Sequence, residues 1–464
     1  MIRLFGVSIV GSILFLVLSE TVLITLCYAA AMYLVFGIDA EPILFVEGGW
    51  LQILLVVAVI QFGLYFSDLY EDFRPRFQML LLQQVCMVLG VAFLLQAIFG
   101  YGRSTMQLPK WTMVYGSAFV LVVIPMWRQL YYRLVRNSVA AQKLLFLGSS
   151  SVVREIVARL TDRPELGFVA MGYLESATTP EVDGIGGLPL LGQLEEVENI
   201  VRTRKPDRVV VGMSERREKL PVLQLLNLRF DGIAIEDAAT TYENVFSRVS
   251  TRDLRPSQLI FLAGFGPKPW SVTLQTIYSL IIALVAIILT LPIVIIVYVL
   301  VKISSPGPAL FKQKRTGRQG VPFMVFKFRS MYVDAEAATG AVWATKNDPR
   351  ITTIGRWLRK LRLDELPQLF NVLRGEMSIV GPRPERPEFV SVLAEKIPFY
   401  SQRHCIKPGI TGWAQINHKY GDTIEDSVIK LEYDLYYIKN LTPAFDAYII
   451  FHTLKVMLLS RGAQ

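Results

Sequence analysis

The sequence predicts a membrane protein of mixed architecture: an N-terminal four-helix transmembrane bundle, a cytoplasmic Rossmann-like α/β module and an α-rich C-terminal domain with a re-entrant membrane helix. The 464 residues are 52% hydrophobic, and their mean hydropathy of +0.41 is high for a soluble chain. Four long apolar stretches come first, then short apolar runs that alternate with amphipathic segments, then a fifth apolar stretch before a basic region. These changes of pattern predict domains at residues 1–140, 141–262 and 263–464.

The first four apolar stretches are each long enough for a helix that crosses a hydrocarbon core of about 30 Å. They lie near residues 8–35, 50–67, 78–99 and 112–127. The first resembles a signal peptide, but it shows no small-residue cleavage site, so we expect an uncleaved helix. Within it lies Glu20, and an ionisable side chain there has either a functional role or a helix-packing role.

Basic residues beside these stretches predict their orientation. The loop at residues 39–47 is acidic and contains no Lys or Arg. The opposite side carries most of the positive charge, at Arg3, Arg74, Arg76, Arg128, Arg133, Arg136 and Lys143. Because basic loops stay in the cytoplasm, we expect the N-terminus and residue 140 on the cytoplasmic side.

Composition also limits the partners of the chain. The formal net charge of +9 suits an anionic membrane surface or anionic substrates. The basic residues are not interleaved with aromatic ones in a recognisable module, so we expect no nucleic acid. The three cysteines, Cys27, Cys86 and Cys405, have spacings that fit neither a disulfide framework nor a zinc site.

The segment from about residue 143 alternates strand-like and helix-like runs. KLLFLGSSS, DRVVVGM (207–213) and DGIAIED (231–237) are strand candidates, and VVREIVARL and LEEVENIVRTRK are helix candidates. This alternation predicts a parallel α/β sheet. The first turn, GSSSVV, lacks the spaced glycines of GxGxxG, so we favour a structural or regulatory module over a dinucleotide site.

The fifth apolar stretch, residues 272–301, is long enough to span a membrane. The segment after it, KISSPGPALFKQKRTGRQG, is strongly basic and belongs on the cytoplasmic side. Pro292 removes a backbone donor in the middle of the stretch. We therefore expect a helix that breaks at Pro292 and leaves the membrane on the side where it entered. A spanning helix with an ordinary proline kink is the alternative.

The stretch LRLDELPQLFNVLRGEMSIVGPRPERPEF, residues 361–389, combines adjacent carboxylates with a stiff arginine loop. Asp364 and Glu365 suit a helix N-terminus, where a proline is tolerated. A helix start does not explain the GPRP sequence. There Pro382 and Pro384 restrict the backbone on both sides of Arg383, which reduces the entropy lost when its guanidinium binds an anion.

From about residue 268 the chain resembles the bacterial sugar transferase family, the monotopic phosphoglycosyl transferases that begin glycan assembly on polyprenyl phosphate. The resemblance rests on FKQKRTGRQGVPFMVFKFRSM (311–331), NDPRITTIGRWLRKLRLDELPQLFNVLRGEMSIVGPRP (347–384), KPGITGWAQIN (407–417) and YDLYYIKN (433–440). Four spans and an α/β module are similar to the larger members, which initiate exopolysaccharide, capsule or O-antigen repeat units. The family commonly has Ser-Pro at the helix break, whereas this chain has Leu291-Pro292.

The resemblance implies transfer of a sugar-1-phosphate from a UDP-sugar to undecaprenyl phosphate, with release of UMP. It implies that Asp364 is the nucleophile and forms a covalent phosphosugar intermediate, and that Glu365 helps to hold Mg²⁺. It assigns Arg359 to phosphate binding; a solvated position on a helix face is the alternative. For a large member the implied donor is UDP-glucose or UDP-galactose, with N-acetylated and deoxy sugars still open.

Other side chains are candidates for phosphate or nucleotide binding. Lys327 and Arg329 in KFRSM are alternate residues of an expected strand and so share one face, where they bind either phosphate or lipid headgroups. Arg350 and Arg403 are weaker candidates for the same role. Gln415, in KPGITGWAQIN, either contacts the uridine or sugar or forms a turn.

Two other classes of function stay open. A non-catalytic scaffold or regulator of glycan assembly would not need Asp364 and Glu365. A glycosyltransferase with a DxD metal motif would need such a motif, and residues 300–464 contain no convincing one. The resemblance implies a multi-pass protein of the bacterial inner membrane with its catalytic domain on the cytoplasmic face, and a homodimer.

Overall fold

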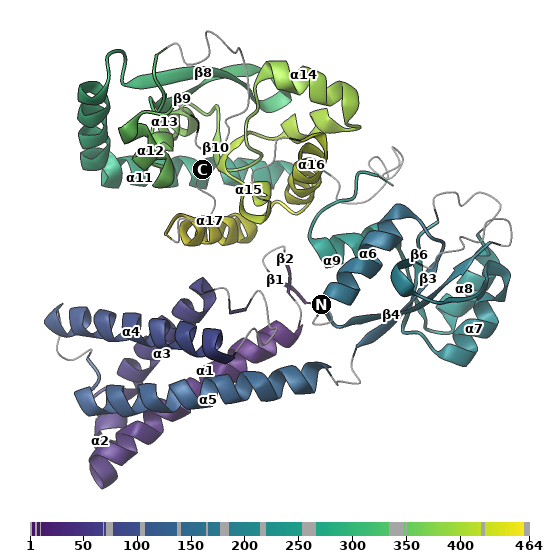
Figure 1. Cartoon of the computed structure of the whole chain (residues 1–464), viewed down its shortest axis with the longest axis horizontal. Coiled ribbons are helices and arrows are strands. Elements are labelled where there is room, and N and C mark those ends of the chain that lie inside the picture. The colour runs from purple at the N-terminus through teal and green to yellow at the C-terminus, as the bar shows by residue number, and fades with distance from the viewer. Residues whose placement is uncertain are drawn as a thin grey trace.

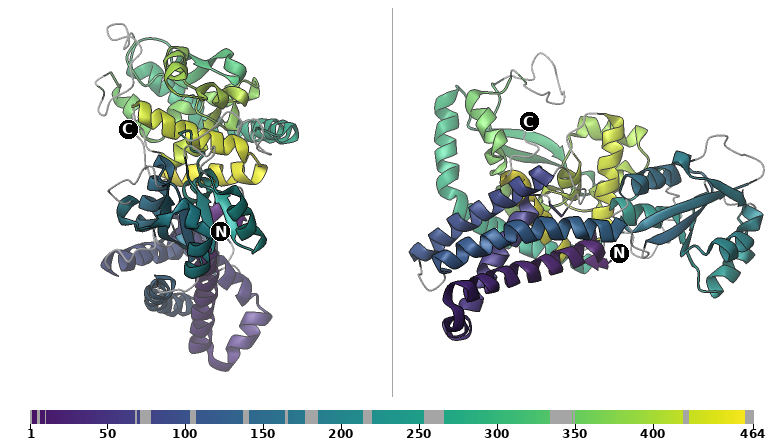
Figure 2. Two further views of the ribbon diagram at one scale, coloured as in Figure 1. Left: turned by 90° about the vertical axis from the view of Figure 1, so that its right-hand side faces the viewer. Right: turned by 60° about the horizontal axis from the view of Figure 1, so that its bottom comes forward.

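The computed structural model describes residues 2–4, 7–9, 11–67, 69–70, 78–102, 107–136, 141–163, 166–176, 185–213, 220–252, 266–333, 348, 350–418 and 423–458. A bundle of long helices, a parallel α/β module and a C-terminal domain follow one another along the chain (Figures 1 and 2). The expected domain boundaries near residues 140 and 262 lie outside the described residues, as do Arg74 and Arg76. The boundaries therefore stay predictions.

The N-terminal bundle contains the four long apolar helices that the sequence predicts. They are α1 (Gly11–Phe36), α3 (Gly49–Phe66), α4 (Gln78–Gly102) and α5 (Lys110–Arg136). By length and composition each can cross a membrane. The first begins later than expected, because β1 (Ile2–Leu4) and β2 (Val7–Ile9) pair as a small hairpin before it. The turn η1 (Gly37–Asp39) and α2 (Ala40–Phe45) join α1 to α3.

Glu20 is fully buried in this bundle and is paired. Its Oε1 lies 2.6 Å from Arg128 Nε and its Oε2 lies 2.9 Å from Arg128 Nη2. The hydroxyl of Tyr70 donates a hydrogen bond to Glu20 Oε2 at 2.5 Å. A buried charge is tolerated only when it is paired in this way, so Glu20 has a helix-packing role that joins α1 to α5.

We expect Glu20→Leu to lower the melting temperature of the purified protein in detergent. The substitution leaves the Arg128 guanidinium buried without its counter-charge, and breaking a buried pair by removing one partner costs about 3–5 kcal/mol. Scanning fluorimetry measures the effect. Glu41→Gln, at an exposed position of α2, is the control and should melt as the wild type does. Equal melting of Glu20→Leu and wild type would show that the pair does not stabilise the bundle.

The α/β module is a five-stranded parallel sheet in the order β5-β4-β3-β6-β7. Its strands are β3 (Gln142–Leu147), β4 (Phe168–Glu175), β5 (Leu190–Gln193), β6 (Arg208–Val211) and β7 (Ala234–Asp237). Side chains of α6 (Ser151–Asp162) and α9 (Ala238–Phe246) form the core on one face. Those of α7 (Val197–Arg204) and α8 (Val222–Phe230) form it on the other. This confirms the expected Rossmann-like arrangement.

Doubly wound sheets bind nucleotides where the strand order reverses, at the carboxyl ends of neighbouring strands. Here that point lies between β3 and β6, where a main-chain hydrogen bond joins the segments that follow the two strands. The Ser150 amide donates to the Gly212 carbonyl oxygen at 3.3 Å. Gly148 has φ +90°, and a Cβ built there would lie only 2.7 Å from Met213 Cγ. Met213 therefore packs directly against the turn after β3.

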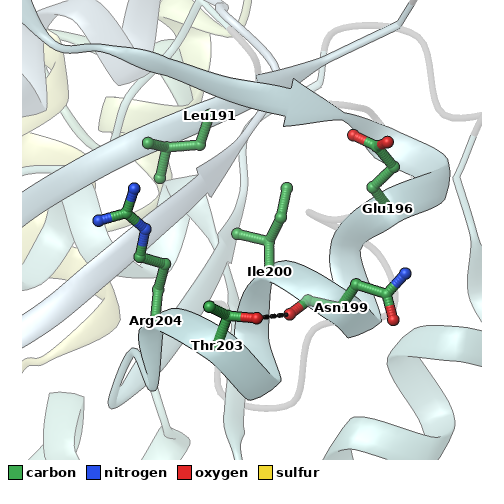
Figure 3. A pocket seen from close by; sticks show the side chains of 6 residues that line it. All are labelled: Leu191, Glu196, Asn199, Ile200, Thr203 and Arg204. Carbon is green, nitrogen blue, oxygen red and sulfur yellow. Dashed lines mark hydrogen bonds between the residues drawn. The ribbon is translucent and has the colours of Figure 1, made fainter.

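A cavity of about 220 Å³ lies at the edge of the same module, beside β5 and α7 (Figure 3). Its lining side chains come from Leu191, Glu196, Asn199, Ile200, Thr203 and Arg204. None of these residues is a candidate for catalysis or substrate binding. The cavity is thus separate from the residues expected to perform chemistry.

The C-terminal domain packs helices around two small sheets. β8 (Leu310–Thr316) and β9 (Pro322–Phe328) form an antiparallel hairpin, whereas β10 (Ser378–Val380) and β11 (Gly409–Thr411) pair in parallel. The helical segments are α11 (Pro269–Ser304), α12 (Thr353–Lys360), η7 (Leu363–Glu365), α13 (Gln368–Leu373), α14 (Pro387–Lys396), η8 (Tyr400–Cys405), α15 (Trp413–Asn417), α16 (Ile424–Lys439) and α17 (Pro443–Leu458).

The fifth apolar stretch forms α11, which stays helical through Pro292. The expected break is therefore a bend: in Figure 1 the ribbon runs along the base of the domain and then turns toward β8. A proline clashes with the preceding turn and bends a helix without having to unwind it. The parts on either side of the bend bury separate stripes, namely Ser271, Gln275, Ser279 and Ala283 in the first part and Val297 and Val301 in the second.

The C-terminal domain touches both of the other parts. α17 lies against α3, where the Tyr65 hydroxyl is 3.2 Å from His452 Nδ1. α16 lies against the α/β module, where Lys439 Nζ pairs with Glu243 Oε1 at 2.7 Å. The domain is thus held between the membrane bundle and the module.

Glu432 is the most buried charge in the contact between α16 and the module. Its carboxylate accepts hydrogen bonds from the Thr251 amide (3.0 Å) and from the Tyr242 hydroxyl (3.1 Å), and it lies 3.3 Å from Arg248 Nε. Three residues of the module therefore satisfy one carboxylate of the C-terminal domain.

Candidate active site

The carboxylate pair Asp364–Glu365 lies on a 3-10 turn between two helices. Thr352 starts α12 by accepting a hydrogen bond from the Gly355 amide (2.9 Å). The chain then turns at Arg362, which has φ +53°, and enters η7. The expected α-helical first turn is wrong, because α13 begins only at Gln368. Successive side chains of a 3-10 turn point about 120° apart, so the two carboxylates still face different directions.

Glu365 is surrounded by three cations. Its Oε1 lies 2.8 Å from Arg383 Nη2 and 3.3 Å from Lys327 Nζ, and its Oε2 lies 3.8 Å from Arg362 Nη1. Burial opposes the ionisation of this carboxyl, but the positive charges of Arg383, Lys327 and Arg362 outweigh it. They hold the pKa of Glu365 well below its usual value. Glu365 is therefore fixed as a carboxylate.

Asp364 has the opposite surroundings. It is buried, and within the part of the chain that the structure describes its carboxyl makes no hydrogen bond or ion pair. Burial, and then the charge of Glu365, raise its pKa above the usual value, while Lys327, Arg359 and Arg383 moderate the rise. A carboxylate of raised pKa that no hydrogen bond engages is a stronger nucleophile than one held by cations, as expected for a residue that forms a covalent intermediate.

The β8–β9 hairpin presents Lys327 to the pair, but it does not present Arg329 there. β9 ends at Phe328, so the alternation that would keep the two side chains on one face stops between them. Arg329 is buried and donates to the carbonyl oxygens of Val301 (3.0 Å) and Ser305 (2.7 Å). It also donates to the carbonyl at residue 306. In this structure Arg329 caps the end of α11.

Arg359 lies in the last turn of α12 and faces the pair. Its Nε donates to the Ser330 hydroxyl at 3.0 Å, and its positive charge lowers the pKa of Asp364. These contacts distinguish it from a solvated residue on a helix face. They leave it among the cations that surround the carboxylates.

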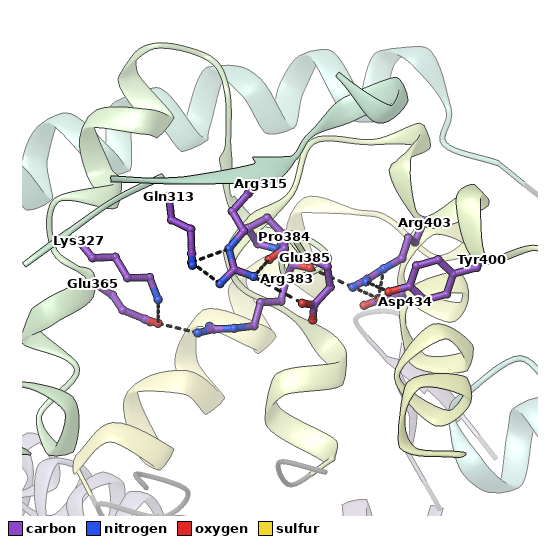
Figure 4. A network of polar contacts seen from close by, with 10 residues as sticks. All are labelled: Gln313, Arg315, Lys327, Glu365, Arg383, Pro384, Glu385, Tyr400, Arg403 and Asp434. Atoms are coloured by element: carbon purple, nitrogen blue, oxygen red, sulfur yellow. Dashed lines mark hydrogen bonds and ion pairs between the residues drawn. The ribbon is translucent and has the colours of Figure 1, made fainter. Parts of the chain in front are cut away.

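The GPRP loop follows β10 and is fixed through its main chain (Figure 4). The Pro382 carbonyl accepts from the Gly409 amide at 3.0 Å, and a Cβ built on Gly409 would lie 2.1 Å from the Gly381 nitrogen. The Pro384 carbonyl accepts from Arg315 Nη1 at 3.1 Å. This bracing aims the side chain of Arg383 at Glu365.

The other predicted binding residues are used elsewhere in the domain. Gln415 Nε2 donates to the Ile410 carbonyl at 3.3 Å, which closes the turn before α15. Arg350 pairs with Asp348 at 2.5 Å. Neither contact reaches the carboxylate pair, and the two alternatives for Gln415 both stay predictions.

Sequence reasoning missed several residues that shape the site. Arg362 lies two residues before Asp364, but its left-handed turn carries no glycine or asparagine signal. Gln313 and Arg315 lie on the same face of the hairpin as Lys327, because Phe311 and Lys327 are paired across it. Alternation in FKQKRTGRQG could have identified these two residues.

Comparison with known proteins identifies the family of the chain. Residues 270–460 match the family model described as bacterial sugar transferase, and residues 61–229 match one described as a CoA-binding domain. The chain is 33% identical over 412 residues to a UDP-glucose:undecaprenyl-phosphate glucose-1-phosphate transferase of Xanthomonas campestris pv. campestris, which covers 85% of this chain and 84% of that protein. The chain therefore belongs to the bacterial sugar transferase family.

Two further relatives show how the similarity is distributed. A protein of the same name from Klebsiella pneumoniae is 34% identical over 359 residues, 76% of this chain and 75% of that one. A UDP-N-acetylgalactosamine-undecaprenyl-phosphate N-acetylgalactosaminephosphotransferase of Aeromonas hydrophila is 42% identical over 222 residues, 48% of this chain and 52% of its own length. Similarity to the first two thus extends well beyond the C-terminal domain.

We expect Arg383→Gln and Lys327→Met to move the acid limb of the pH–activity profile to higher pH. Each cation lowers the pKa of Asp364, so its removal raises that pKa. A nucleophilic carboxyl must be ionised, and activity is lost as the pH falls through its pKa. Residual activity measured between about pH 4 and pH 8 tests the shift. Lys396→Gln, at an exposed position of α14, is the control; an acid limb that stays in place in both test variants contradicts the assignment.

Proposed function

We propose that the chain transfers a sugar-1-phosphate from a UDP-sugar to undecaprenyl phosphate and releases UMP, as the first membrane step of exopolysaccharide, capsule or O-antigen assembly. The observation that carries the proposal is the Asp364–Glu365 pair. Burial and nearby cations shift the pKa values of the two carboxyls in opposite directions. Such a separation marks two carboxyls with different chemical roles.

The reaction takes place in two displacements at one phosphorus atom. An oxygen of Asp364 attacks the phosphorus that bears the sugar, the bond from this phosphorus to the bridging oxygen breaks, and UMP leaves with that oxygen. A phosphate oxygen of undecaprenyl phosphate then attacks the same phosphorus, which breaks the bond to Asp364. A lipid diphosphate sugar forms and the carboxylate is regenerated, so no net proton transfer is required.

The surrounding cations make this sequence possible. A diphosphate and a carboxylate repel each other, and fixed positive charge in a partly buried site lowers that cost. Arg383, Lys327 and Arg359 supply this charge. Because the phosphosugar stays on the enzyme while UMP leaves, the two anionic substrates need not occupy the site together.

Mg²⁺ fits the site as a partner of Glu365. Among the described residues no group of three or more His, Cys, Asp or Glu could hold a metal ion. Mg²⁺ commonly binds through one or two carboxylates together with substrate phosphates, which is the donor set that Glu365 and a diphosphate would provide. When bound, the ion would neutralise charge on the diphosphate; Glu365 would hold it, and Arg383 would be released toward phosphate oxygens.

A UDP-hexose, either UDP-glucose or UDP-galactose, is the proposed donor. Two relatives whose similarity extends beyond the C-terminal domain are named for UDP-glucose and another is named for galactose, which supports this choice over an N-acetylated sugar. Activity measured against a panel of UDP-sugars with undecaprenyl phosphate would identify the donor.

We propose that α11 enters and leaves the membrane on one side. Both of its parts dock on the same domain: Gln275 Nε2 donates to the Tyr437 hydroxyl at 2.6 Å, and Arg329 caps the other end through Val301. A straight helix of this length would be about 54 Å long and would carry its ends to opposite faces of a core of about 30 Å. Around the bend, Leu289 and its apolar neighbours are exposed and suit lipid.

This geometry supports a catalytic domain on the cytoplasmic face of the bacterial inner membrane, where nucleotide sugars are available. The site would then lie at the inner leaflet, beside the headgroup of the polyprenyl phosphate. A homodimer stays an expectation from the family resemblance.

Asp364→Asn should abolish UMP release and lipid labelling while the protein stays folded. Loss of a nucleophile costs more than about 10³-fold in rate. Wild type incubated with a radiolabelled UDP-sugar but no acceptor should carry label on Asp364, detectable by peptide mass spectrometry. Glu365→Gln should also be strongly impaired.

Full activity in Asp364→Asn would rule out the covalent mechanism. Kinetics that require a ternary complex, with no labelled enzyme, would do the same. Complementation of a glycan-deficient strain by Asp364→Asn would favour the scaffold alternative.

Cysteines introduced by Lys268→Cys and Ser304→Cys should react with a membrane-impermeant maleimide only from the cytoplasmic side. Both positions are exposed and lie at the two ends of α11. The native residues Cys27, Cys86 and Cys405 are replaced by serine in the parent protein, which is the control for background labelling. Labelling of the two positions from opposite sides would establish a spanning helix.

A further inference from the structure

The pair Arg403–Asp434 lies behind the GPRP loop and is not used by the proposed chemistry. Arg403 on η8 is 5% exposed and Asp434 on α16 is 1% exposed. Arg403 Nη2 lies 2.8 Å from Asp434 Oδ2, and Arg403 Nε donates to the same oxygen at 3.0 Å. The two residues, 31 positions apart in sequence, therefore form a bidentate buried ion pair.

Arg403 makes two further hydrogen bonds. Its Nη1 donates to the Tyr400 hydroxyl at 2.8 Å, and its Nη2 donates to the main-chain carbonyl of Arg383 at 3.0 Å (Figure 4). A buried ion pair adds little net stability compared with well-packed apolar residues of the same size. This buried pair also donates a hydrogen bond to the main-chain carbonyl of Arg383. Its role is therefore better explained by the backbone geometry that it fixes at Arg383 than by a gain in stability.

That carbonyl belongs to the residue whose side chain reaches the active site. The Arg383 guanidinium donates to Glu365 Oε1 at 2.8 Å, and the next carbonyl, of Pro384, is held by Arg315. Prolines on both sides restrict the backbone of Arg383. Arg403 and Arg315 thus hold the carbonyls of Arg383 and Pro384 from outside the loop. The position of the main chain then determines where the Arg383 guanidinium points.

We propose that Arg403 and Asp434 are positioning residues for Arg383. The inference rests on the proposed function for the role of Arg383, but the contacts themselves do not. Arg403 contacts neither Asp364 nor Glu365. It acts through the main chain of the GPRP loop. Asp434 acts one step further away by orienting Arg403.

The variant that tests this is the double substitution Arg403→Gln with Asp434→Asn. Removing both charges together leaves no unpaired charge buried, and melting in detergent checks that the protein is folded. Displacement of a binding group by about 1 Å costs up to about 10²-fold. We expect kcat/KM for the UDP-sugar to fall by about 10- to 100-fold.

A double-mutant cycle with Arg383→Gln separates positioning from a general loss of structure. If Arg403 and Asp434 act through Arg383, their substitution in the Arg383→Gln background lowers kcat/KM by less than about 3-fold, because coupled residues are not additive. An equal fold-loss in both backgrounds would overturn the proposal.

Hydrogen exchange of residues 378–386, followed by mass spectrometry, gives a readout that does not depend on activity. The double variant should exchange faster in this segment than wild type. Lys439→Gln, which removes a different partly buried ion pair at α16, should leave it unchanged. Unchanged hydrogen exchange of residues 378–386 in the double variant would contradict the proposal. If wild type releases no UMP from any UDP-sugar, the proposed function fails, and the exchange experiment still decides this inference.

Tyr400→Phe is the milder variant to use if the double substitution does not fold. It removes one hydroxyl from Arg403 and keeps the ring. As in the double variant, hydrogen exchange of residues 378–386 should become faster and kcat/KM should fall, each by a smaller factor. No change in either quantity would count against the positioning role.

Discussion

The ion pair between Arg383 and Glu365 determines what the two adjacent carboxylates can do. Without it, two carboxyls side by side in a buried site would share one proton and neither would have a defined role. With it, Glu365 stays ionised at 2.8 Å from the Arg383 guanidinium. Asp364 is then the carboxyl of the pair that takes up a proton as the pH falls. The chemistry of Asp364 is thus set by the charge balance of its neighbour.

The architecture of the chain follows closely from hydrophobic pattern. The four N-terminal helices coincide with apolar stretches because an α-helix satisfies the backbone hydrogen bonds of a single lipid-exposed segment within that segment. DRVVVGM and DGIAIED contain β6 and β7 as expected, since short apolar runs between helix-like segments form buried parallel strands. The carboxylate pair and the GPRP loop could also be picked out from residue types alone, and the structure brings them together.

Tertiary contacts account for what the sequence did not predict. The helix start expected at the carboxylate pair is a 3-10 turn, because a left-handed residue at Arg362 precedes it. Arg329 turns away from Lys327 because β9 ends one residue too early to keep them on one face. The pairing of Arg403 with Asp434 joins distant segments, and nothing local in either segment indicates it.

The contact between α16 and the α/β module has a consequence for exchanging parts between members of the family. Glu432 is buried by the C-terminal domain but satisfied by residues of the module, among them Thr251 and Arg248. A chimera that combines the module of one relative with the C-terminal domain of another has to bring a matching set of donors. If it does not, Glu432 is buried at the junction without hydrogen-bond donors. The two parts are therefore expected to evolve together.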